Sequence, residues 1–156
     1  MGKIRLLCIG NQKFKSLTEL EKEYEKKINY FVNFTISIIK PEKIKDEKRS
    51  MEIEGEKILE RINKDDILIS LDRRGKELTS EKFADFISDR INYGGKNMVF
   101  AIGSAAGLSA NLIKRSDTVI SFSKMTFAHD IFKIVFLEQL YRAFTIIKKT
   151  GYHRKD

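Results

Sequence analysis

Five short apolar runs recur along the sequence, separated by segments of helical length, and this alternation limits the fold more than any other feature. The runs are dense in branched aliphatic side chains, which favour strands; they span residues 3–9, 33–39, 67–71, 98–102 and 118–121. The segments between them repeat apolar residues at spacings of three and four, which predicts helices at 17–28, 51–62, 80–91, 108–115 and 131–147. Alternation of this kind predicts an α/β fold with a mostly parallel sheet and helices on both faces.

Local signals mark where these elements end. Ser80 is expected to cap the third helix, and Gly94 and Gly95 to end it. Residues 72–76 are expected to form a turn after the third strand, and the charged stretch 42–49 is expected to be a mobile loop. No repeat or linker divides the 156 residues, so residues 1–156 are predicted to form a single domain.

The composition narrows the class of partner. The formal net charge of +8 favours an anionic partner, nucleic acid first. The single cysteine, Cys8, excludes an internal disulfide and is expected to be a buried, unreactive thiol. No run approaches the roughly 18 apolar residues that cross a bilayer, and the first ten residues are too charged for a secretory signal. We therefore expect a cytoplasmic protein with no membrane contact and, because no His and Cys cluster has ligand spacing, no metal.

Ligands of parallel sheets bind outside the carboxyl ends of the strands. The loops after residues 71, 102 and 121 are therefore where a site is expected. Gly103 and Gly107 punctuate one of these loops, although two glycines alone indicate only a tight turn. The dinucleotide fingerprint and the Gly-x-Ser-x-Gly elbow are both absent from the sequence.

The last helix is unusually apolar. Between residues 131 and 147, 12 of 17 residues are apolar, whereas a helix on one face of a sheet needs only about half that. We expect that a chain of this size cannot cover such a helix alone, so a second subunit is predicted. His129 and Lys133 share a face near the start of the helix, where an anion site is an alternative to a solvated first turn.

Four motifs of the last third resemble the RlmH (YbeA) family of SPOUT methyltransferases. They are Ile-Gly-Ser-Ala-Ala-Gly-Leu at 102–108, Ser-Phe-Ser-Lys-Met-Thr-Phe at 121–127 with His129, Glu-Gln-Leu-Tyr-Arg-Ala at 138–143, and Tyr-His-Arg at 152–154. The resemblance extends over the whole chain, including residues 3–6 and the pair Leu71 and Asp72. Four motifs in the right order make this resemblance specific.

The resemblance implies a C-terminal trefoil knot, an exception to the rule that chains do not thread loops. It also implies a homodimer, S-adenosylmethionine as methyl donor, and methylation of N3 of a pseudouridine in helix 69 of large-subunit ribosomal RNA on the ribosome. By motif position, the donor site would involve Leu71, Gly103, Phe122, Ser123, Lys124, Met125, Thr126 and Phe127.

Acceptor chemistry is assigned to the tail and the last helix. The N3 proton must leave, and His153 is the side chain best suited by type to accept it. Arg142 and Arg154 complete the expected catalytic set by holding phosphates or base carbonyls. His129, Lys133 and Tyr152 are the expected RNA contacts. On composition alone, a frayed basic terminus explains the tail equally well.

Three residues depart from the family pattern. Ser104 replaces a second glycine, Ala128 a proline and Lys133 an arginine, and the last change loses the planar fork of a guanidinium. Two alternatives stay open beside ribosomal RNA methylation. One is a SPOUT methyltransferase that acts on transfer RNA, and the other is a non-catalytic RNA-binding or ribosome-assembly factor of the same fold.

Overall fold

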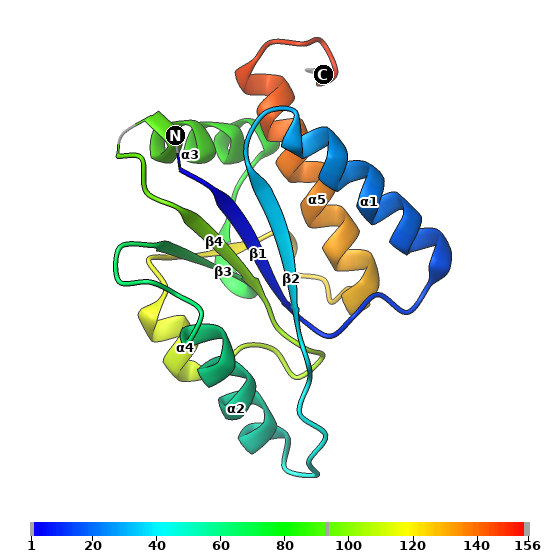
Figure 1. Ribbon diagram of the computed structural model, residues 1–156, viewed down its shortest axis with the longest axis vertical. Helices are drawn as coiled ribbons and strands as arrows, with labels where there is room; N and C mark the ends of the chain where they lie inside the picture. Colours follow the sequence, from blue (N-terminus) through cyan, green and yellow to red (C-terminus); the bar gives the residue numbers. More distant parts are fainter. Residues whose placement is uncertain (1, 93, 155–156) are drawn as a thin grey trace.

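The computed structural model describes residues 2–92 and 94–154, which form one α/β domain (Figure 1). Strands and helices alternate along it in the order β1(Ile4–Ile9), α1(Lys15–Asn29), β2(Phe34–Ile39), α2(Glu47–Leu59), β3(Ile67–Glu77), α3(Ser80–Asn92), β4(Met98–Ile102), α4(Ala110–Arg115), β5(Thr118–Ser121) and α5(His129–Ile147). The sheet order is β2-β1-β4-β3-β5 and every pairing is parallel. Helices α1, α3 and α5 cover one face, and α2 and α4 cover the other. The predicted fold class is therefore confirmed.

The stretch predicted as a loop at 42–49 is partly helical, because α2 begins at Glu47. Asp46 caps this helix by accepting a hydrogen bond from the backbone N–H of Arg49. Arg49 also pairs with Glu52 one turn later, at 3.4 Å. The first turn of α2 is stabilised by charged residues at helical spacing and has no apolar face. Apolar periodicity in the sequence therefore could not predict it.

Strand β3 does not end in a turn at residues 72–76, as predicted, but runs on to Glu77. Its register against β5 shifts between Leu71 and Lys76, so residues 72–75 leave the ladder as a bulge. Gly75 allows this, because a Cβ there would lie 2.6 Å from the backbone of Val119. The cap of α3 also differs, since Thr79 rather than Ser80 accepts the hydrogen bond from the N–H of Lys82.

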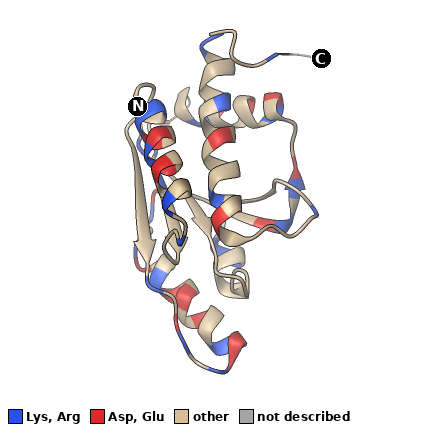
Figure 2. Cartoon of the chain, turned by 90° about the vertical axis from the view of Figure 1, so that its right-hand side faces the viewer, with Lys and Arg blue, Asp and Glu red and all other residues tan. Residues whose placement is uncertain are grey.

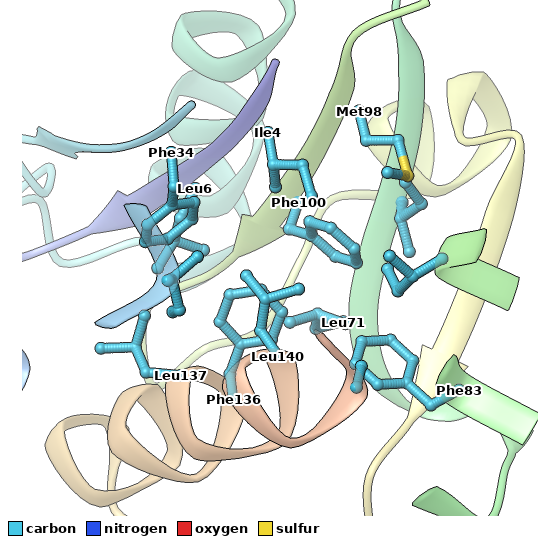
Figure 3. Close-up of a cluster of buried hydrophobic side chains, with 14 of the residues drawn as sticks. Ile4, Leu6, Phe34, Leu71, Phe83, Met98, Phe100, Phe136, Leu137 and Leu140 are labelled. Carbon is cyan, nitrogen blue, oxygen red and sulfur yellow. The ribbon is translucent and has the colours of Figure 1, made fainter. Parts of the chain in front are cut away.

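Helix α5 is covered in part by its own chain. It lies between α1 and α3 and packs on the sheet, and Figure 2 shows it as a mostly tan helix beside the charged α1. Phe136, Leu137 and Leu140 point from α5 towards the aromatic and aliphatic side chains of the sheet (Figure 3) and are fully buried. Ile131 on the same helix is 44% exposed, and Ile134, Tyr141 and Ile147 are only partly buried, so the chain alone covers α5 incompletely. The homodimer and the knot stay predictions.

Among residues 2–92 and 94–154, no helix is long and apolar enough to cross a membrane. The same ranges contain no group of three or more His, Cys, Asp or Glu side chains that could hold a metal ion.

Candidate functional site

A pocket of about 520 Å³ opens at the carboxyl ends of β4 and β5, beside the bulge of β3. The loops that follow β4 and β5 form part of its wall, as the position rule for parallel sheets predicts, and the bulge within β3 forms the rest. Seven of the eight expected donor-site residues line it, namely Leu71, Gly103, Phe122, Ser123, Met125, Thr126 and Phe127. Lys124 is not part of the lining, and its side chain is 87% exposed.

Backbone geometry shapes the side of the pocket that follows β4. A Cβ on Gly103 would lie 2.6 Å from the carbonyl oxygen of Gly107, so only glycine fits there. Gly107 has a φ of 93°, a left-handed conformation that glycine adopts without strain. Its N–H donates to the carbonyl of Ser104 at 2.9 Å, which closes a tight turn. The two glycines of the motif therefore set the shape of this wall.

The loop after β5 holds its form through short-range hydrogen bonds and ring contacts. The Ser123 hydroxyl accepts from the N–H of Met125, and its carbonyl accepts from Ser121, both at 2.9 Å. Phe122 packs edge-on against Phe83 on α3, with ring centroids 5.3 Å apart. The aromatic side of the pocket is thus anchored to the core, while Met125 at its mouth is 75% exposed.

His129, the first residue of α5, faces the pocket from the end nearest β1. Its Nε2 lies 3.4 Å from the Sγ of Cys8, and burial raises the pKa of that thiol to about 12. Burial also lowers the pKa of His129, which favours the neutral ring. The pKa of His129 is lower in the folded chain than in the unfolded chain. His129 therefore lowers the free energy of unfolding as the pH falls below its pKa in the unfolded chain.

Lys133 does not reach the surface. Its side chain is 1% exposed, and its Nζ donates to Oε1 of Glu21 on α1 at 2.8 Å. Lys133 is therefore paired within the chain and is not available to an anion or to RNA. The contact expected of His129 stays a prediction.

Replacing Lys133 with Met should lower the free energy of unfolding by about 3 kcal/mol, because the Glu21 carboxylate then stays buried without its partner. This is the lower end of the usual range, since Glu21 is 15% exposed. Urea denaturation measures the change. The double variant Lys133→Met/Glu21→Gln is the matched control and should recover part of the loss. Equal losses in both would show that packing, not the ion pair, is responsible.

The tail folds back on α5 and α3. Nη1 of Arg142 lies 3.2 Å from Nδ1 of His153, and Nε2 of His153 lies 2.9 Å from the Glu81 carboxylate. A guanidinium can only donate, so Nδ1 accepts and Nε2 carries the proton. The Tyr152 ring packs edge-on against Tyr141, with centroids 5.0 Å apart. Both ring nitrogens of His153 are therefore engaged within the chain.

The structure brings the expected catalytic residues near one another but not to the pocket. Arg142 and His153 are in contact, and exposed Arg154 follows them. Arg142 follows His129 by 13 positions along the helix, which is about 20 Å at 1.5 Å per residue. Figure 1 shows the tail beyond the far end of α5 from its first turn. One chain in this form holds the two halves of the expected site apart.

The chain is similar in sequence to a known protein family. The family model described as "Predicted SPOUT methyltransferase" covers residues 2–153. The chain belongs to the SPOUT methyltransferase family. Among relatives, it is 41% identical to a protein of Christiangramia forsetii named "Ribosomal RNA large subunit methyltransferase H", over 97% of this chain and 99% of that protein. A protein of the same name from Streptococcus agalactiae serotype III is 37% identical, with the same coverage.

A solved structure shares the fold. It is titled "The structure of a probable methylase family protein from Haemophilus influenzae Rd KW20" and matches with a TM-score of 0.55 at 11% identity. The match covers 99% of this chain and 71% of that one.

Two departures from the SPOUT methyltransferase pattern have local explanations. The Ser104 hydroxyl donates to Oε1 of Glu54 at 2.9 Å, and this buried carboxylate also accepts from the N–H of Glu42. Ser104 thus ties the pocket loop to α2. Ala128 has a φ of −56° at the start of α5, which is the conformation a proline would impose. The backbone at Ala128 therefore keeps this conformation without a proline ring.

Sequence reasoning missed several lining residues. Asp72, Arg73 and Arg74 belong to the bulge of β3, and Phe132 to the first turn of α5. The only signal for the first three was their place directly after a buried strand. Nothing in the sequence showed that the chain would bulge there and then rejoin the sheet.

Proposed function

We propose that this chain transfers a methyl group from S-adenosylmethionine to large-subunit ribosomal RNA in the cytoplasm. The acceptor is N3 of a pseudouridine in helix 69, on the assembled ribosome. The pocket beside the β3 bulge, at the carboxyl ends of β4 and β5, carries the proposal, because the loops after β4 and β5 hold family motifs. The relatives named for large-subunit ribosomal RNA favour that substrate, and the net charge of +8 suits it.

The pocket fits the proposed donor in size and lining. Its volume of about 520 Å³ falls within the roughly 300–1,000 Å³ of small-molecule sites. Phe122 and Phe127 offer apolar surface, and the turn from Gly103 to Gly107 offers backbone groups at close range. Bound there, S-adenosylmethionine would supply an electrophilic methyl group. Leu71, Gly103 and the loop from Phe122 to Phe127 would hold and orient it, so orientation would provide most of the rate.

The acceptor side requires a base and cations. Removal of the N3 proton is assigned to His153, with Arg142 and Arg154 holding the RNA and Tyr152 stacking on a base. In the folded-back tail, Nδ1 of His153 already accepts from Arg142 and Nε2 is protonated towards Glu81. The ring therefore has to leave at least one of these partners before it can accept a proton.

A homodimer resolves the separation between pocket and tail. The tail lies about 20 Å along α5 from the pocket of its own chain. A second copy related by a two-fold axis, with the two α5 helices antiparallel, would present its own tail to that pocket. We therefore propose that each working site combines the pocket of one subunit with residues 151–154 of the other.

Purified protein should transfer labelled methyl groups from S-adenosylmethionine to ribosomes that lack this modification, with one pseudouridine as acceptor. Light scattering of the same sample should report twice the chain mass of 18.1 kDa. Transfer to transfer RNA instead of ribosomes would favour the other SPOUT substrate class. Failure to bind the donor would favour a non-catalytic RNA-binding or ribosome-assembly factor.

A further inference from the structure

The mouth of the pocket carries two arginines that the family motifs do not include, together with Lys124 of the motif at 121–127. Arg73 and Arg74 lie on the β3 bulge and line the pocket, and Lys124 lies on the facing loop. All three side chains are exposed. These exposed cations are available to contact a ligand that enters the pocket.

The bulge that carries the two arginines is held in place. Gly75 anchors its far end, because the backbone of Val119 leaves no room there for a Cβ. Asp72 anchors the near end, because its Oδ1 accepts from the N–H of Arg74 at 2.9 Å. Guanidinium groups on such a fixed segment are already positioned before a ligand arrives, which lowers the entropy cost of binding.

The three cations are not equivalent. Arg74 forms a two-pronged pair with Asp72, at 2.8 and 2.9 Å, and the Arg74 hydrogen bonds lower the pKa of that carboxyl. Nζ of Lys124 lies 3.7 Å from Oε1 of Glu77. Arg73 donates from Nη1 to the hydroxyl of Thr126 across the pocket mouth, at 3.3 Å. Within residues 2–92 and 94–154, no carboxylate lies within ion-pair distance of Arg73.

We infer that Arg73 is a phosphate-binding and positioning residue, which grips the RNA backbone beside the nucleotide that enters the pocket. The inference rests on the proposed function and deepens it. A guanidinium with one N–H fixed by Thr126 keeps other donors for the paired oxygens of a phosphate. Arg74 and Lys124 add positive charge around it, and the exposed side chain of Met125 offers apolar surface to a base.

An anionic RNA backbone fits this rim better than the carboxylate of the donor does. The rim spreads three cationic side chains over the outside of the mouth, where a polyanion can meet several at once, while one small carboxylate can meet only one or two. Each phosphate contact also contributes to the salt dependence of binding, which provides a measurable signature.

The test compares Arg73→Ala, Arg73→Lys and Lys96→Ala with the wild-type protein. Lys96 is exposed and precedes the amino end of β4, so this control removes the same charge at the opposite edge of the sheet. Steady-state methylation of ribosomes lacking the modification gives KM and kcat at several KCl concentrations. Calorimetry gives the Kd for S-adenosylmethionine, and light scattering gives the mass.

Arg73→Ala should raise the KM for ribosomes about tenfold and make its logarithmic salt dependence shallower by about one. The kcat, the donor Kd and the mass should not change. Arg73→Lys should restore the salt dependence but only part of the affinity, because lysine keeps the charge and loses the fork. Lys96→Ala should match the wild-type protein.

Three outcomes would overturn the inference. An unchanged KM and salt slope would remove Arg73 from the RNA contact. A weaker donor Kd with unchanged ribosome KM would make Arg73 a ligand of the donor carboxylate. A lower mass would place the rim in a subunit interface. If the wild-type protein does not methylate ribosomes, the proposed function fails, and binding of labelled ribosomal and transfer RNA by the same variants, at the same salts, still decides the role of Arg73.

Discussion

Truncation after Thr150 should abolish methyl transfer while the fold and donor binding remain. The shortened chain loses Tyr152, His153 and Arg154 but keeps the whole pocket, which lies at the other end of α5. Loss of a positioned proton acceptor alone costs on the order of a hundredfold or more, and loss of the cation and the aromatic ring adds to it. Single-turnover methylation of ribosomes measures the effect, and calorimetry measures donor affinity.

Single substitutions separate the contributions of the tail. His153→Ala should lower turnover with little change in the KM for ribosomes, whereas Arg154→Ala should raise KM and weaken its salt dependence. Lys149→Ala, just before the truncation, is the control for charge in this region and should leave both constants unchanged. A truncated protein that methylates at the full-length rate would show that the tail is passive. The base would then have to be sought near the pocket.

Gly103→Val should reduce donor affinity on the order of a hundredfold, which corresponds to a loss of about 2.8 kcal/mol of binding free energy. The new Cβ would fall 2.6 Å from the carbonyl oxygen of Gly107 and 2.9 Å from Leu108, so the loop must move into or away from the pocket. Calorimetric titration with S-adenosylmethionine measures the loss, and circular dichroism follows the fold.

The matched control is Gly94→Val, where the nearest atom to a new Cβ is a lysine side-chain carbon 4.0 Å away. That variant should bind the donor as the wild-type protein does. Gly103→Ala, a smaller change at the same point, should lie between the two. Undiminished binding by Gly103→Val would place the donor elsewhere on the chain.

The strand and helix pattern was readable from the sequence because burial dictates it. Continuous apolar runs marked β4 and β5 with their bounds as the structure has them, since both consist largely of buried residues. The loops that line the pocket followed from the rule for parallel sheets. Local sequence pattern and tertiary structure agree in these segments.

The failures of prediction share a different cause, which is contact between distant segments. The bulge of β3 depends on the close approach of Gly75 to β5, about 45 residues later in the chain. The burial of Lys133 depends on Glu21 in α1. No window of local sequence contains both partners of these contacts.

The tail shows the same limit at the level of function. Its residue types indicated a base, a cation and an aromatic platform, and the structure places His153 against Arg142. The distance between the tail and the pocket follows from the length of α5. The sequence indicated that length, because its apolar periodicity predicts a helix at 131–147. The direction of that helix, away from the pocket, became visible only in the folded chain.

The most direct test of the composite site pairs two inactive chains. A heterodimer of the Thr150 truncation and Gly103→Val, each with its own affinity tag and purified through both, contains one intact pocket whose partner carries an intact tail. If the tail acts across the dimer, this heterodimer should recover about half of the wild-type rate of ribosome methylation, because one of two sites is complete. A heterodimer as inactive as its parent homodimers would contradict the proposal and show that each tail serves the pocket of its own chain.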